Sequence, residues 1–121
     1  MSAESKPKPI RKPDKPEEVE QEIRQVRGLM RDFDLTEQQV RADTRIRQLL
    51  KGILYAHFHA EDVRRGNWDH SAPIRDLPDL DDYLGRFGLS EDDLDNPTFQ
   101  ELLEAKMRSD AKIAALKQSQ I

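Results

Sequence analysis

Apolar residues recur at helical spacing in four stretches of the chain. The clearest stripe lies within residues 16–33, where intervals of four, three, four and three residues separate Val19, Ile23, Val26, Met30 and Phe33. This spacing places all five side chains on one face of a helix. No segment alternates apolar and polar residues with the period of two that is typical of a half-buried strand. The pattern predicts an all-α fold, a small three- or four-helix bundle-like domain.

A second helix is predicted over about residues 37–65. Thr36 and Gln39 have the spacing of a capping box at its start, and Gly66 is suited to end it. Adjacent apolar residues widen the stripe, as expected for a central helix that contacts more than one neighbour. The apolar positions are Val40, Ile46, Leu49, Leu50, Ile53, Leu54, Phe58 and Val63.

Two more helices are predicted, over about residues 79–87 and 97–118. The first has a short apolar face that includes Tyr83 and is followed by Gly88, a residue suited to end a helix. The second begins at Asn96-Pro97, with proline in the first turn, where its missing N–H costs little. Its second half is rich in Ala and Lys and only weakly apolar, so the sequence leaves open whether that half docks on the domain.

The first fifteen residues have a different composition from the rest. Prolines alternate with cations there, and Ile10 is the one sizeable apolar side chain after Met1. Such a segment buries too little apolar surface to offset the entropy of ordering it. We therefore expect residues 1–15 to form a flexible, disordered basic arm and residues 16–121 to form a single helical domain. The cations of the arm are Lys6, Lys8, Arg11, Lys12 and Lys15.

Charge is distributed unevenly along the chain. Residues 76–104 contain ten carboxylates against Arg86 alone, a net charge of −9, whereas residues 1–15 and 105–121 each carry a net charge of +3. The whole chain has a net charge of −4 and no cysteine, which rules out disulfides and zinc–cysteine sites. Its longest apolar run is four residues, so we expect a cytoplasmic protein that makes no contact with a membrane.

Three residues form the best candidate set for a metal site: His57, Glu61 and His70. His57 and Glu61 are four residues apart on the second predicted helix and could share one face, with His70 in the following loop as a third ligand. The competing interpretation is one histidine packed at a helix interface and another in solvent. A metal needs at least a third ligand beyond the helical pair, and no Glu lies three residues before a histidine, as the di-iron pattern of helical bundles requires, so we predict no metal and no cofactor.

Motifs for catalysis are absent from the sequence. There is no Gly-x-Ser-x-Gly, no glycine-rich phosphate loop and no cysteine nucleophile. His70 and Ser71 are adjacent, but a nucleophile–base pair is defined by geometry in space rather than by sequence proximity. We therefore predict no catalytic residue.

These features favour a non-enzymatic protein-interaction module, an accessory or regulatory subunit of a larger protein assembly. The basic arm would lie along an acidic surface of a protein partner, and the acidic region 76–104 would face a basic one. Trp68 and Tyr83 are the further candidates for partner binding, because aromatic residues often anchor interfaces. A second copy of the chain is another possible partner.

A DNA-binding protein of the helix-turn-helix type is the alternative. The first two predicted helices are separated by a short break, and Arg41, Arg45 and Arg47 could contact phosphates together with the basic arm. Against this, acidic and polar residues alternate with the arginines, as on an ordinary salt-bridged helix surface, and the overall pI is about 5.4. Nucleic acid is therefore a less favoured partner than protein.

Overall fold

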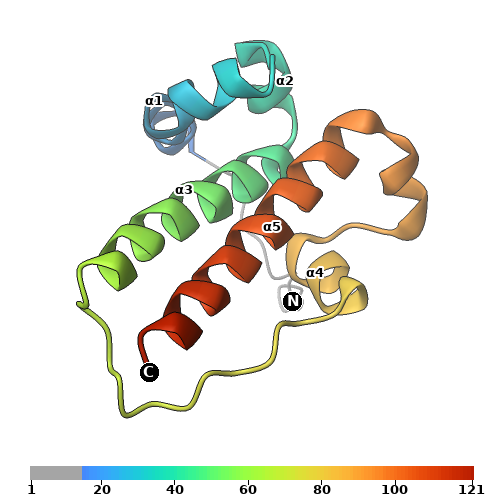
Figure 1. Cartoon of the computed structure of the whole chain (residues 1–121). Helices are drawn as coiled ribbons and strands as arrows, with labels where there is room; N and C mark the ends of the chain where they lie inside the picture. The colour runs from blue at the N-terminus through green and yellow to red at the C-terminus, as the bar shows by residue number, and fades with distance from the viewer. Residues whose placement is uncertain (1–14) are drawn as a thin grey trace, which may run out of the picture.

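A computed structural model of the chain describes residues 15–121 and confirms an all-α fold over that range (Figure 1). The predicted arm residues Lys6, Lys8, Arg11 and Lys12 lie outside the described residues. The elements are α1 (Pro16–Asp32), α2 (Glu37–Ala42), α3 (Thr44–Arg64), α4 (Leu80–Phe87), the 3₁₀ helix η2 (Glu91–Asp95) and α5 (Pro97–Ser119). No helix in this range is long and apolar enough to cross a membrane.

Helices α3 and α5 form the central pair and run side by side in the same direction (Figure 1). Their amino-terminal halves share a main core with residues of α1, α2 and α4. Their carboxyl-terminal halves share a smaller end cluster, made of Ala56, Ala60, Val63 and Ile113 with Trp68 and Leu116 packed against it. The parallel arrangement requires a long return connection, which consists of the loop 66–79, α4 and η2.

Helix α1 packs on α3 through the stripe that the sequence predicts. Ile23, Val26 and Met30 are buried in the main core, with Val19 and Phe33 packed against it. Two cations of α3 hold this contact on its polar side, because Arg47 and Lys51 both bind the Glu22 carboxylate, at 3.0 and 2.8 Å. Pro16 occupies the first turn of α1, where a missing N–H is tolerated.

The prediction of one continuous helix over residues 37–65 is wrong. Asp43 has an extended backbone (φ −132°, ψ 112°) and separates α2 from α3. Its carboxylate accepts a hydrogen bond from the Arg45 N–H at 2.9 Å and so caps the start of α3. Burial opposes ionisation of Asp43, but the hydrogen bonds from Arg45 outweigh it and lower the pKa of this carboxyl. The Thr36–Gln39 capping box is present at the start of α2, as predicted.

Helix α4 lies against the main core and α5. Its Tyr83 ring is buried, and the hydroxyl donates a 2.7 Å hydrogen bond to Asp110 of α5. Gly88 ends the helix in the left-handed conformation (φ 68°), which glycine adopts without strain. Gly52 of α3 allows a close approach, since a Cβ there would lie 3.3 Å from Lys106 Cε and 3.4 Å from Phe87 Cζ.

The second half of α5 docks on the end of α3. Ile113 is buried in the end cluster. The Gln120 side chain donates to the Val63 carbonyl at 2.5 Å and accepts a 2.6 Å hydrogen bond from Trp68 Nε1. One glutamine thus ties the carboxyl ends of both central helices to the start of the long loop.

Candidate functional site

A groove of about 560 Å³ lies between α3 and α5 beyond the main core, alongside the end cluster. Small side chains make it possible, because Ala56 and Ala60 of α3 and Ser109 of α5 fill little of the space between the helices. We call it the end groove. Its remaining lining residues are His57, Phe58, Glu61, Arg64, Arg108 and Lys112.

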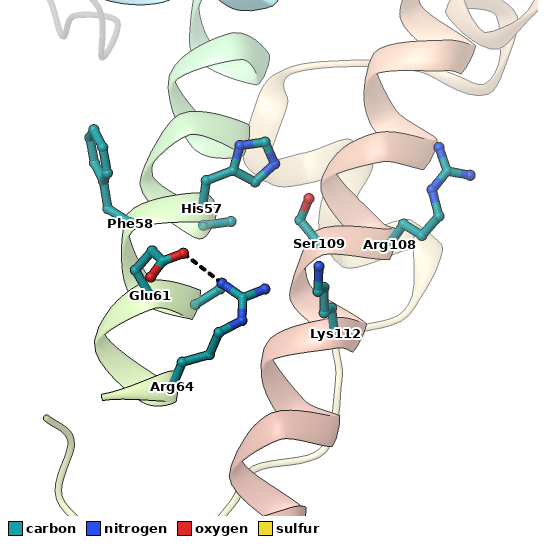
Figure 2. Close-up of a pocket in the computed structure, with 9 residues that line it drawn as sticks. His57, Phe58, Glu61, Arg64, Arg108, Ser109 and Lys112 are labelled. Atoms are coloured by element: carbon teal, nitrogen blue, oxygen red, sulfur yellow. Dashed lines mark hydrogen bonds and ion pairs between the residues drawn. The ribbon is translucent and has the colours of Figure 1, made fainter. Parts of the chain in front are cut away.

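The lining of the end groove is cationic. Figure 2 shows Phe58 and Arg108 on opposite sides of it, with His57, Arg64, Ser109 and Lys112 between them. Glu61 is the single carboxylate of the lining, and it binds Arg64 at 2.9 Å. Arg108 and Lys112 form no ion pair within residues 15–121. The groove therefore presents positive charge that the described part of the chain does not neutralise.

The helix macrodipole does not account for Arg108 and Lys112. Cations near a helix carboxyl terminus stabilise it through the macrodipole, but this effect fades within the last turn. Arg64 and Lys117 stand in the last turns of α3 and α5. Arg108 and Lys112 lie further back along α5, which ends at Ser119. The macrodipole therefore does not explain their presence at the groove.

Phe58 is exposed, although its place in the apolar pattern predicted a core position. The ring is 58 % exposed, and Tyr55, three residues earlier on the same helix, is 54 % exposed. The buried residues of this part of α3 are Ile53, Ala56, Ala60 and Val63, a helical spacing that excludes Phe58. Two large aromatic rings one turn apart on an open helix surface are a feature of interaction sites.

The metal-site candidates do not come together. His57 and Glu61 both line the end groove, but the ring of His70 stacks near Trp68, with 4.3 Å between the ring centroids. Within residues 15–121 no group of three or more His, Cys, Asp or Glu side chains could hold a metal ion. Glu61 is paired with Arg64, so no carboxylate in the groove is available to activate His57 or Ser109. The chemistry offered here is recognition of an anion beside an aromatic ring.

The predicted partner-binding residues of the described chain occupy three different environments. Lys15 is exposed and precedes α1 as its N-cap residue. Trp68 is half-buried against the end cluster. Tyr83 is 1 % exposed, and both burial and its hydrogen bond to Asp110 raise the pKa of its phenol. Tyr83 therefore belongs to the core of this structure and presents no surface to a partner.

The three arginines of the DNA-binding alternative bind groups of the protein itself. Arg47 is 3 % exposed and donates to the carbonyls of Val40 and Arg41, both at 2.8 Å, as well as to Glu22. Arg45 binds the carboxylates of Asp43 and Asp93. Arg41 binds Glu20 and Glu37, which raises the pKa of its guanidinium. The three arginines therefore do not share one exposed face, as the DNA-binding alternative requires.

Comparison of the chain with protein-family models, with curated protein sequences and with solved structures finds no match. The sequence contains only a partial signal for the groove. The basic character of residues 105–121 was visible in the sequence. That these cations and Phe58 line the same groove depends on the parallel packing of α3 and α5. The helical register, which places Phe58 out of line with Ile53, Ala56 and Ala60, was the one signal that could have identified this ring as exposed.

Proposed function

We propose that this protein is a non-enzymatic interaction module, an accessory or regulatory subunit, that binds an acidic segment of a protein partner in the end groove. One observation carries the proposal: Arg108, Lys112 and His57 line one groove beside the exposed Phe58, and the only carboxylate there is already paired with Arg64. A partner segment with carboxylates and an apolar residue would complement both features.

The composition of the groove supports a protein partner. Aromatic residues and arginine are enriched in protein–protein interfaces and dominate their binding energy when they are desolvated at the centre. Phe58 and Arg108 lie on opposite sides of the groove (Figure 2), and the small residues Ala56 and Ala60 also line it. From the sequence we predict that the basic residues of positions 1–15 bind the same acidic partner.

Acidic side chains of η2 lie at the end of the α3–α5 pair that is remote from the end groove. This arrangement supports a directional mode of binding. Carboxylates of η2 lie beside the start of α5, and Asp93 is paired with Arg45 near the start of α3. The groove lies beside the second halves of the same helices. Opposite charge at the two ends of one helix pair would orient a charged partner during encounter.

Site-specific photo-crosslinking tests the proposal. A photoreactive phenylalanine analogue is placed at Phe58, and at Gln100, an exposed residue in the first half of α5, as the control. We expect a crosslinked protein from native cells at Phe58 and not at Gln100, with the crosslink mapped to an acidic segment. No product at Phe58, crosslinking of a second copy, or mapping to a basic or uncharged segment would contradict the proposal.

Charge exchange then tests the recognition chemistry with the captured segment as a synthetic peptide. Arg108→Glu with Lys112→Glu should weaken binding at least tenfold, whereas Arg24→Glu with Arg31→Glu, an equal charge change on exposed α1 positions, should leave it nearly unchanged. Replacing the peptide carboxylates by lysine should restore binding to the groove variant. Affinity that stays constant between roughly 50 and 500 mM salt would rule out electrostatic recognition. Salt-steep binding of duplex DNA in place of the peptide would favour the alternative.

A further inference from the structure

A second hollow, of about 530 Å³, lies on the other side of α5 from the end groove. It is bounded by the loop 66–79, by Arg86 of α4 and by Ile113, Ala114 and Lys117 of α5. We call it the loop pocket. In Figure 1 the loop swings around the carboxyl ends of α3 and α5 before it reaches α4. The volume is within the range of pockets that hold small organic ligands.

One wall of the loop pocket is apolar. Trp68, Ile74 and Leu77 come from the loop, and Ile113 comes from α5. Leu77 is 47 % exposed, and Trp68 is half-buried with its Nε1–H already bonded to Gln120. The indole N–H therefore needs no further polar partner, and the ring lies among His70, Lys117 and the end cluster at the edge of the pocket. Such a wall would take up the hydrocarbon part of a ligand.

The polar groups of the pocket leave an excess of positive charge. Both lining carboxylates are occupied: Asp69 accepts hydrogen bonds from the Ser71 hydroxyl and N–H, and Asp110 accepts them from Tyr83 and Lys106. The Ser71 hydroxyl and N–H also lower the pKa of Asp69, so this carboxylate keeps its negative charge. The positive excess comes from the three lining cations, Arg75, Arg86 and Lys117, against the two carboxylates. Lys117 Nζ lies 5.4 Å from the centre of the Trp68 ring.

Besides Lys117, the cations of the lining are Arg75 and Arg86. They come from different segments, the loop and α4, and both are exposed. Neither forms an ion pair within residues 15–121, and the Arg86 guanidinium lies 5.4 Å from the centre of the Tyr83 ring. A guanidinium binds a carboxylate or sulfonate through paired hydrogen bonds in a fixed geometry.

We infer that the loop pocket binds a small amphipathic organic anion, with its hydrocarbon part against Trp68, Leu77 and Ile113 and its acidic group at Arg75 and Arg86. This site is independent of the proposed function, because it shares no lining residue with the end groove. The expected ligand class is a medium-chain or aromatic carboxylate.

Titration of the full chain with dodecanoate below its micelle concentration tests the inference. Trp68 is the single tryptophan of the chain, so its emission reports the pocket directly. We expect a saturable change with dodecanoate and none with acetate, which lacks the hydrocarbon part, or with dodecyltrimethylammonium, which has the wrong charge. Equal binding of the cation, or a response to dodecanoate that never saturates, would overturn the inference.

Variants at exposed positions separate site binding from general adsorption. Arg75→Gln with Arg86→Gln should weaken dodecanoate binding roughly tenfold or more, the effect of losing charge-assisted hydrogen bonds to the acidic group. Arg24→Gln with Arg65→Gln, two exposed arginines that line neither hollow, is the matched control and should bind as the unaltered chain does. Unchanged affinity of the Arg75/Arg86 variant would contradict the assignment.

Amide and indole chemical shifts locate the bound anion. Dodecanoate should shift the signals of the Trp68 indole, Leu77 and Ala114 and leave those of Phe58 and Lys112 in place. Because the end groove is also basic, shifts confined to Phe58 and Lys112 would show that the anion prefers that groove and would overturn the loop-pocket site.

Discussion

The two halves of the α3–α5 pair differ in how they are covered. The first halves are packed by α1, α2 and α4, and residues such as Leu49, Leu50 and Leu102 are fully buried there. The second halves share only the smaller end cluster, with the end groove on one side and the loop pocket on the other. Stability therefore comes mainly from the first halves, while the surfaces suited to recognition are gathered on the second.

This division follows from side-chain size. Large aliphatic residues on the first halves require several neighbouring helices to cover them. On the second halves, Ala56 and Ala60 leave little apolar surface to cover, so the two helices can remain exposed to solvent on their outer faces. Cations and exposed aromatic rings can then occupy those faces without disturbing the main core.

Truncation of leucines in the two halves should have the largest and the most unequal effects on stability. Leu50→Ala in the main core should lower the free energy of unfolding by about 2–5 kcal/mol, because it leaves a cavity among fully buried side chains. Leu116→Ala in the end cluster should cost only about 1–2 kcal/mol, since that side chain is partly exposed to water. Urea denaturation followed by far-UV circular dichroism measures both. Equal losses would mean that the second halves are as important to stability as the first.

The Tyr83–Asp110 hydrogen bond lies where the main core meets the second half of α5. Tyr83→Phe should cost about 1.5–3 kcal/mol, because Asp110 is charged and loses one of its two donors. Burial and the bond to Asp110 raise the pKa of Tyr83, so folding favours its protonated form. This stabilisation is complete below about pH 10, the ordinary pKa of tyrosine, and is lost as the pH rises further.

Denaturation at a series of alkaline pH values checks this. The unaltered chain should lose stability above about pH 10 more steeply than Tyr83→Phe does. Tyr55→Phe is the matched control, because Tyr55 is the other tyrosine of the chain and is exposed. Parallel pH profiles for the unaltered chain and Tyr83→Phe would show that the phenol contributes nothing to this loss.

Local signals in the sequence predicted the helices well where they agreed with one another. Proline in the first turn and a regular apolar stripe placed the first helix at 16–33, and α1 spans Pro16–Asp32. At Asp43 two signals pointed to a break: Val40 and Ile46 are six residues apart, which is not helical spacing, and Asp43-Thr44 is suited to start a new helix. The break is stabilised by Arg47, which donates to two carbonyls at the end of α2 from the following helix.

The end groove could not be predicted from local signals alone. It joins Phe58 to Arg108 and Lys112, residues about fifty positions apart in the chain, through the parallel packing of α3 on α5. Helical periodicity identifies which face of each helix is apolar, but not which helices lie side by side or in which direction. For the same reason the sequence left the docking of the last helix open, although Gln120 and Ile113 hold it to α3.

The smallest effect is expected at the carboxyl end, where Gln120 joins Trp68 to the Val63 carbonyl. Gln120→Ala removes both hydrogen bonds and should cost about 1 kcal/mol, since two neutral bonds near the surface are replaced by bonds to water. Trp68 should then become more exposed, and its emission should shift to the red. Gln118→Ala is the matched control, because Gln118 is an exposed glutamine in the same turn whose side chain forms no hydrogen bond in the described chain. If the emission of Gln120→Ala matches that of Gln118→Ala, the packing of Trp68 on the end cluster holds the loop without the Gln120 hydrogen bonds. The second halves of α3 and α5 are then more firmly covered than the groove and the pocket beside them indicate.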